Sequence, residues 1–136
     1  MAQQKVDFDK LTTGYEFEPS VFSITGESVD KYLDAVNGSR GIYEKNNTVP
    51  PMSITALAMA AMAERLSMPS GAIHVSQEVQ FLNQVRLGEE LISYARVNRV
   101  VKRGKLHMLS IGITVVNDKN ISVLSGETSF ILPVSQ

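Results

Sequence analysis

The residues that could do acid–base or nucleophilic chemistry are few in this 136-residue sequence. It contains two histidines, His74 and His107, and no cysteine. A thiol nucleophile and a disulfide framework are therefore excluded, and a zinc site would need carboxylate ligands, so we expect no bound metal. His107 follows Lys105 beside a predicted turn, and we expect its side chain to be exposed.

His74 stands in a segment where apolar and polar residues alternate, which predicts a half-buried strand. The apolar face of this strand would carry Ile73, Val75, Val79 and Phe81. The opposite, polar face would carry His74, Ser76, Glu78 and Gln80. On that face His74 would be either a surface or subunit-interface residue, or an acid–base group in a pocket.

Tyr43 and Glu44 lie in residues 37–49, a glycine- and asparagine-rich stretch without a sustained period that predicts a loop. Loops of this length in compact domains are often functional. Tyr43 would either anchor the loop on the core or line a pocket. Glu44, which precedes Lys45, would be either a solvated charge or a general base.

Two helices are predicted on either side of this loop. Thr25 is a suitable N-cap for a short amphipathic helix that ends near Gly38, where a left-handed residue is expected. Pro50–Pro51 favours the start of a second helix over Ser53–Leu66. This second helix is apolar on nearly all sides, so we expect it to be buried.

The second half of the chain predicts an antiparallel meander, because long segments with a period of two are separated by turn residues. Together with the two helices this gives an α+β fold class in a single domain, 1–136, of which 1–20 is irregular or arm-like. The further strands are predicted near 21–24 and at 91–102, 106–116 and 121–132.

The charge balance and the length of the apolar runs exclude several function classes. The 13 Lys and Arg against 14 Asp and Glu give a net charge of -1, which attracts neither nucleic acid nor anionic lipid. The longest apolar run, 56–63, is too short to span a membrane. We therefore expect no nucleic-acid or membrane partner, and the lack of cysteine and of a visible export signal predicts a cytoplasmic protein. A basic cluster at a predicted hairpin tip would be a solvated strand end or would attract the phosphates of a ligand or an acidic protein: Arg96, Arg99, Lys102, Arg103 and Lys105.

Three segments resemble successive signatures of MaoC-like hydratases and dehydratases: YLDAVNGSRGIYEKN, VPPMSITALAMA and GAIHVSQEVQFLNQVRLGEEL. The resemblance covers residues 22–133. It implies a hot-dog fold, in which a long antiparallel sheet wraps around a central buried helix, and (R)-specific enoyl-CoA hydratase or 3-hydroxyacyl dehydratase chemistry of fatty acid metabolism. It also implies a homodimer, a heterodimer with a second hot-dog subunit, or higher multiples. The ligand would be an acyl-CoA or acyl-carrier protein pantetheine thioester at the subunit junction, with no other cofactor.

The sequence departs from this family at the catalytic positions. In the family, the loop supplies an Asp and a His, and the start of the buried helix supplies a backbone N–H. Aligned on the first helix, the Asp and His positions fall on Gly38 and Tyr43, or on Ser39 and Glu44 if one residue is inserted. The donor position falls on Pro51, which has no N–H. The site therefore resembles the non-catalytic half of two-part dehydratases.

The predicted function is a non-catalytic or degenerate acyl-thioester-binding subunit. Two alternatives remain open: an active hydratase, dehydratase or thioesterase, and a structural dimerisation module. The candidates for a catalytic role are Tyr43, Glu44 and His74. The candidates for substrate binding are Ser39, Tyr43, Pro51, Met52, Ser53 and His74.

Overall fold

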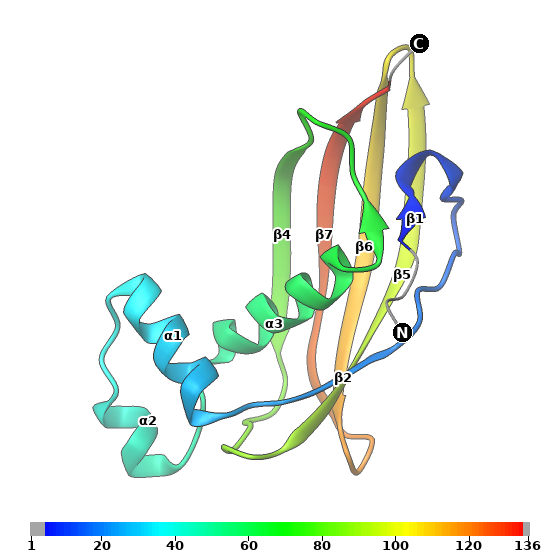
Figure 1. Cartoon of the computed structure of the whole chain (residues 1–136). Helices are drawn as coiled ribbons and strands as arrows, with labels where there is room; N and C mark the ends of the chain where they lie inside the picture. Colours follow the sequence, from blue (N-terminus) through cyan, green and yellow to red (C-terminus); the bar gives the residue numbers. More distant parts are fainter. Residues whose placement is uncertain (1–4, 135–136) are drawn as a thin grey trace.

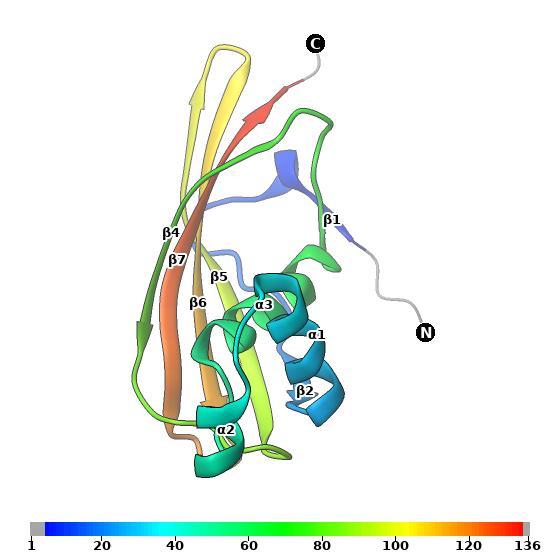
Figure 2. The same ribbon diagram turned by 90° about the vertical axis from the view of Figure 1, so that its left-hand side faces the viewer.

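The computed structural model describes residues 5–134. One five-stranded antiparallel sheet, in the order β2-β5-β6-β7-β4, forms the main layer, and the helices lie against one of its faces (Figures 1 and 2). The predicted α+β class and the meander of the second half are confirmed. The strands of this sheet are β2 (Ser20–Ser23), β4 (Ile73–Phe81), β5 (Glu90–Arg103), β6 (Leu106–Asn117) and β7 (Ser122–Pro133).

Helix α1 (Gly26–Val36) begins where the cap chemistry predicts. Thr25 accepts a hydrogen bond from the Ser28 backbone N–H, and the Ser28 side chain accepts one from the Thr25 backbone. The predicted left-handed residue is wrong, because Asn37 adopts that conformation, with φ 55°, in place of Gly38. Asparagine tolerates this region better than most residues, so the chain can turn one residue earlier.

The stretch 37–49 is not the continuous loop that its composition predicts. It contains α2 (Gly41–Asn46), a helix of six residues. The Arg40 guanidinium, just before α2, lies 2.8 Å from the Asp30 carboxylate and 3.2 Å from the Asp34 carboxylate of α1. These exposed ion pairs contribute about 0–1 kcal/mol each. They hold the start of α2 close to α1.

Helix α3 (Pro51–Ala63) crosses the face of the sheet against which the helices lie, called the inner face below (Figures 1 and 2). Its buried side consists of Ser53, Ile54, Thr55, Ala58 and Met62. The facing alternation in β6 is as predicted, and its buried members are Leu109, Ile111, Ile113 and Val115. The helix is not buried all round in the single chain, because Ala56, Ala60 and Ala63 are exposed.

The start of the N-terminal segment packs near the end of the sheet that carries the β5–β6 hairpin. Strand β1 (Val6–Asp7) pairs in parallel with β3 (Leu66–Ser67), and η1 (Phe8–Lys10) follows. The prediction that His107 is exposed is wrong: only 8% of it is exposed, and its ring lies 5.8 Å from that of Phe8. Residues 1–4 of the predicted irregular arm lie outside the described residues.

Gly126 sets the spacing between β4 and β7, which is the only neighbour of β4 within the described sheet. A Cβ at Gly126 would lie against the Glu78 carbonyl oxygen and 3.3 Å from the Val79 Cα. We expect Gly126→Ala to lower the free energy of unfolding by about 1–3 kcal/mol, because backbone must move to admit the methyl group. Urea denaturation measures this, and amide hydrogen exchange should localise the loss to β4.

Gly41→Ala is the matched control, since a Cβ at Gly41 meets nothing within 4 Å. It should leave the stability unchanged or slightly higher. A Gly126→Ala variant as stable as the wild type would contradict the close contact between the two strands.

Candidate functional site

A cleft of about 580 Å³ lies between α2, the start of α3 and the segment that follows β4. This volume is within the roughly 300–1,000 Å³ range typical of small-molecule sites. The residues that line it are Ile42, Tyr43, Asn46, Thr48, Val49, Pro51, Ile54, Phe81, Leu82, Asn83, Gln84, Val85 and Val123.

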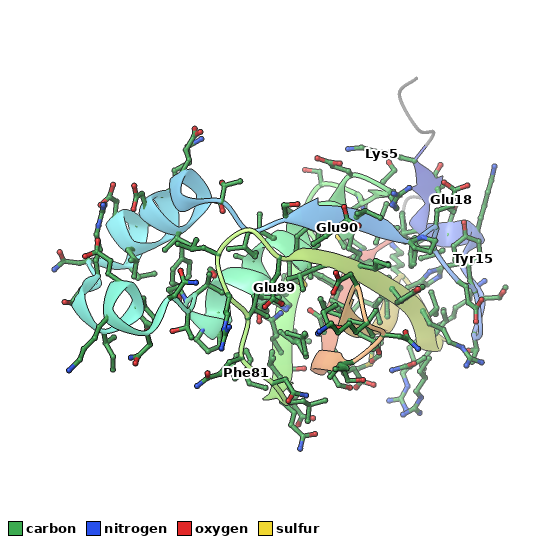
Figure 3. The ribbon with its side chains drawn as sticks, turned by 90° about the horizontal axis from the view of Figure 1, so that it is seen from below. Lys5, Tyr15, Glu18, Phe81, Glu89 and Glu90 are labelled. Carbon is green, nitrogen blue, oxygen red and sulfur yellow. The ribbon has the colours of Figure 1, made fainter. Side chains whose placement is uncertain are left out.

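Backbone pairing joins the two walls of this cleft. The Val49 N–H donates to the Val85 carbonyl at 3.0 Å, and Thr48 forms an isolated antiparallel bridge with Arg86. One side of the mouth is exposed, with Phe81 43% and Leu82 42% accessible at the end of β4. Seen from below, Phe81 lies far from the N-terminal segment that carries Lys5 and Tyr15 (Figure 3). The cleft therefore opens at the β4 edge of the sheet.

The side chains that line the cleft are either apolar or polar and uncharged. Among the described residues that line it there is no carboxylate, imidazole, ammonium or guanidinium group, and Tyr43 has the only ionisable side chain. Tyr43 is half-buried and also packs against the hydrophobic core. Such a surface can bind a neutral ligand and donate or accept hydrogen bonds, but it lacks a general acid–base pair.

Tyr43 and Pro51 are the two predicted site residues that the fold brings together in this cleft. Ser53 is buried beside it, and its hydroxyl donates to the Pro50 carbonyl at 2.5 Å. Met52 is 42% exposed and Ser39 is exposed, and neither lines the cleft.

Glu44 lies in a smaller depression of about 150 Å³ next to the cleft. This depression also has Asp30, Arg40 and Tyr43 on its wall, so Tyr43 separates the two hollows. Glu44 itself is exposed. The fold therefore does not place the Glu44 carboxylate in the cleft beside Pro51.

His74 does not lie on the face that the alternation predicts. A bulge between His74 and Ser76 shifts the register against β7, so that His74 faces Phe130 while Gln77 faces Thr128. Opposed residues of an antiparallel pair share a face, so His74 lies on the inner face, with Gln77. The prediction that groups His74 with Ser76 is wrong because one inserted residue reverses the alternation.

His74 is also remote from the cleft of its own chain. It lies near the start of β4, and Phe81 ends the strand seven residues later. At ~3.3 Å per residue this separation is about 23 Å. The fold therefore does not bring His74 together with Tyr43 and Pro51 within one chain.

Several polar residues of the cleft were missed by sequence reasoning. Asn46, Thr48, Asn83 and Gln84 line it, and the Asn83 amide also donates to the Ser122 carbonyl at 2.7 Å. The available signal was the pair of adjacent amides at Asn83 and Gln84, directly after the predicted strand. Adjacent amides after a strand are also common in ordinary turns, so the signal was weak.

The basic cluster lies away from the cleft. Strand β6 runs from the β5–β6 hairpin tip at Leu106 to Asn117 at the opposite end of the sheet (Figure 1). This length is about 36 Å. The hairpin tip that carries Arg103 and Lys105 is therefore at the other end of the sheet from α2. Phosphates of a ligand in the cleft of the same chain would not reach it.

Residues 5–134 contain neither a metal-ligand cluster nor a helix suited to span a membrane. No group of three or more histidine or carboxylate side chains could hold a metal ion in this part of the chain. No helix within the same residues is long and apolar enough to cross a membrane.

The structure is similar to solved hot-dog proteins. It matches the R-hydratase PhaJ1 from Pseudomonas aeruginosa with a TM-score of 0.75 and 22% identity, over 93% of this chain and 85% of the other. The MaoC-like dehydratase from Rhodospirillum rubrum gives 0.75 and 13%, over 95% and 97%. The HadBC (3R-hydroxyacyl-ACP dehydratase) complex from Mycobacterium tuberculosis gives 0.69 and 18%, over 88% and 96%. Curated proteins give no match to the sequence.

The class defined by this fold is the hot-dog class, with α3 against the inner face of an antiparallel sheet. A family model for the FAS1-like dehydratase domain region matches residues 11–125. Because that match spans most of the chain, the chain belongs to the FAS1-like dehydratase domain region family. The predicted resemblance to MaoC-like hydratases and dehydratases is thereby confirmed.

Thr55 provides a test of how α3 is packed below the cleft. Its side-chain oxygen is the buried side-chain polar atom without a hydrogen-bond partner in residues 5–134, and only 3% of the residue is exposed. Thr55→Val keeps the shape and removes the unpaired hydroxyl, so we expect it to raise the free energy of unfolding by about 1 kcal/mol. Chemical denaturation measures the change.

Ser53→Ala is the matched comparison on the same helix face. It removes a hydroxyl that donates to Pro50, so it should lower stability by about 0.5–1.5 kcal/mol. If Thr55→Val also lowers stability, the Thr55 hydroxyl has a partner and its assigned surroundings are wrong.

Proposed function

We propose that this chain is a cytoplasmic acyl-thioester-binding subunit of the hydratase/dehydratase group that has no turnover of its own. The observation that carries the proposal is the cleft: it has the size of a ligand site but no carboxylate or imidazole among the described residues that line it. A second hot-dog subunit, which carries the catalytic Asp and His, would supply the chemistry.

The lining of the cleft supports the choice of an acyl thioester. A thioester is uncharged around its reacting carbon, so it needs apolar walls and a few placed polar groups rather than ion pairs. Ile42, Ile54 and Val123 provide apolar surface, and Asn46 and Gln84 provide amide groups. The amides could hydrogen-bond the thioester carbonyl or the amides of a pantetheine arm of CoA or carrier protein.

We propose no turnover because the described residues that line the cleft lack the groups that hydration requires. Adding water to an enoyl thioester needs a base, an acid and a donor for the enolate-like oxygen. Pro51 begins α3 and has no N–H to offer such an oxygen. Tyr43 alone cannot provide both proton transfers. We therefore propose that the ligand is bound and shaped by this chain and transformed only with a catalytic partner.

Catalysis provides the direct test. Positioned acid–base groups contribute about 10²–10⁴-fold and an oxyanion donor a further ~10²–10³-fold, so we expect the purified chain to hydrate crotonyl-CoA no faster than buffer. Loss of the enoyl absorbance measures the rate. Addition of a hot-dog chain from the same source that carries the loop Asp and His should restore turnover.

The alternative of an active enzyme is tested with three variants in the same assay: Tyr43→Phe, Glu44→Gln and His74→Ala. Turnover by the chain alone that one of these variants abolishes would refute the non-catalytic proposal. Binding of butyryl-CoA, followed by calorimetry, separates a ligand-binding chain from a purely structural module.

The partner would pair along β4, which is an edge of the sheet. An edge strand exposes unpaired backbone N–H and C=O groups, and a second strand can satisfy them. Apolar side chains are exposed at both ends of this strand, with Ile73 57%, Val75 46% and Phe81 43% accessible. We propose that the chain alone is a homodimer through this edge, and that a catalytic hot-dog chain can occupy the same edge.

Sedimentation velocity tests this pairing. The wild-type chain should sediment as a dimer at micromolar concentration. Ile73→Lys should shift it towards monomer, because the charge would have to be buried without a partner. Val21→Lys, on the opposite edge strand β2 and 60% exposed, is the control that should leave the dimer intact. The reverse pattern would assign the interface to β2.

A further inference from the structure

His74 is the described histidine whose imidazole lies at the open edge of the sheet, and it is held in a defined orientation there. Its Nε2 shares a hydrogen bond of 2.6 Å with the Thr128 hydroxyl, and its ring stacks on Phe130 with centroids 4.9 Å apart. Thr128 is fully buried, so the imidazole is hydrogen-bonded to a side chain of the core. No hydrogen-bond partner within residues 5–134 occupies the other ring nitrogen, Nδ1.

The cleft and this imidazole lie at opposite ends of the same edge strand. The cleft opens beside Phe81, at the end of β4, and His74 lies near its start. Both are on the inner face of the sheet, because the bulge after His74 reverses the alternation. Figure 1 shows α1 and α2 beyond the β4 edge, and the cleft is lined by residues of α2 and by Phe81 and Leu82 at that edge.

An antiparallel pair related by a twofold axis brings the start of one strand opposite the end of the other. The centre of β4 is Gln77. With Val75 as the unpaired bulge residue, an axis at Gln77 places the partner's His74 opposite Val79, and an axis at Glu78 places it opposite Phe81. The second register puts the imidazole beside Phe81 at the cleft, and the first puts it two residues away from Phe81, in both cases on the inner face.

The distribution of apolar residues along β4 favours such self-pairing. Ile73 and Val75 are exposed at one end, Phe81 and Leu82 at the other, and the residues between are mainly polar. Antiparallel pairing of two copies joins apolar end to apolar end at both sites. A strand with all of its apolar residues at one end would not complement itself in this way.

We propose that, in a dimer of two copies paired through β4, the partner's His74 lies at this chain's cleft and hydrogen-bonds the bound ligand through Nδ1. The inference rests on the acyl-thioester function proposed above and deepens it, because each of the two ligand sites is then built from both subunits. His74 is a binding residue in this arrangement. It acts in the neighbouring cleft and not in its own.

Hybrid dimers distinguish action within a chain from action between chains. Gln84→Trp should block the cleft of its own chain, because Gln84 is an exposed residue of the lining that a large indole can replace without disturbing the core. His74→Ala should weaken butyryl-CoA binding about fivefold, as expected for one lost hydrogen bond. Each homodimer is measured by calorimetry, and the hybrid is isolated with two different affinity tags.

The hybrid has one open cleft, on the chain that carries His74→Ala, facing the intact His74 of the chain that carries Gln84→Trp. We expect one site per dimer with wild-type affinity. A single site with the fivefold weaker affinity would mean that His74 acts in its own chain or only supports the strand, and would overturn the inference. If the wild-type chain binds no butyryl-CoA, the proposed function fails, and the inference fails with it.

Cross-linking tests the geometry without a ligand. The chain has no cysteine of its own, so introduced thiols react specifically. The double variant His74→Cys/Phe81→Cys should form covalent dimers with a short bis-maleimide, because the two positions lie about 23 Å apart within one chain but side by side across the dimer. His74→Cys alone should remain uncross-linked. Efficient cross-linking of that single variant would place the axis near His74 and overturn the inference.

Discussion

The hydrophobic core forms where α3 packs against the inner face of the sheet. Ile54, Ala58 and Met62 on the helix and Ile111 and Val115 on the sheet are all buried. Burial of each large apolar side chain contributes about 1.5–3 kcal/mol. This contact also fixes the start of α3 beside the end of β4. The cleft exists because these two ends meet, and α2 closes its third side.

The edge strand β4 carries most of the proposed recognition. It pairs with β7 on one side, and nearly all of its side chains are exposed in the single chain. Gly126 allows β7 to approach its backbone closely. The bulge next to His74 then directs an imidazole towards the helix-covered face. Exposed apolar side chains, an unpaired edge and an anchored histidine together make this strand suited to a second subunit.

Membership of a dehydratase family does not by itself make the chain a dehydratase, because a fold can persist after its catalytic groups are lost. The hot-dog architecture is that of the solved hydratases and dehydratases to which the chain is similar. The groups that line the cleft are amides, a phenol and apolar side chains. They favour binding over proton transfer. Pro51, at the start of α3, also has no N–H to donate to an enolate-like oxygen.

Local sequence patterns were enough to predict the features that act over a few residues: the Thr25 cap, the buried helix that follows Pro50 and the period-two stripe of β6. Cap chemistry and periodicity are local, so no other part of the chain was needed to predict them. The folded chain was needed to show that Tyr43 and Gln84 line the same cleft and that Phe8 of η1 packs against His107. It also decided the face of His74, because one bulge residue reverses an alternation and only pairing with β7 reveals it. Such contacts join residues far apart in sequence, and no local pattern encodes them.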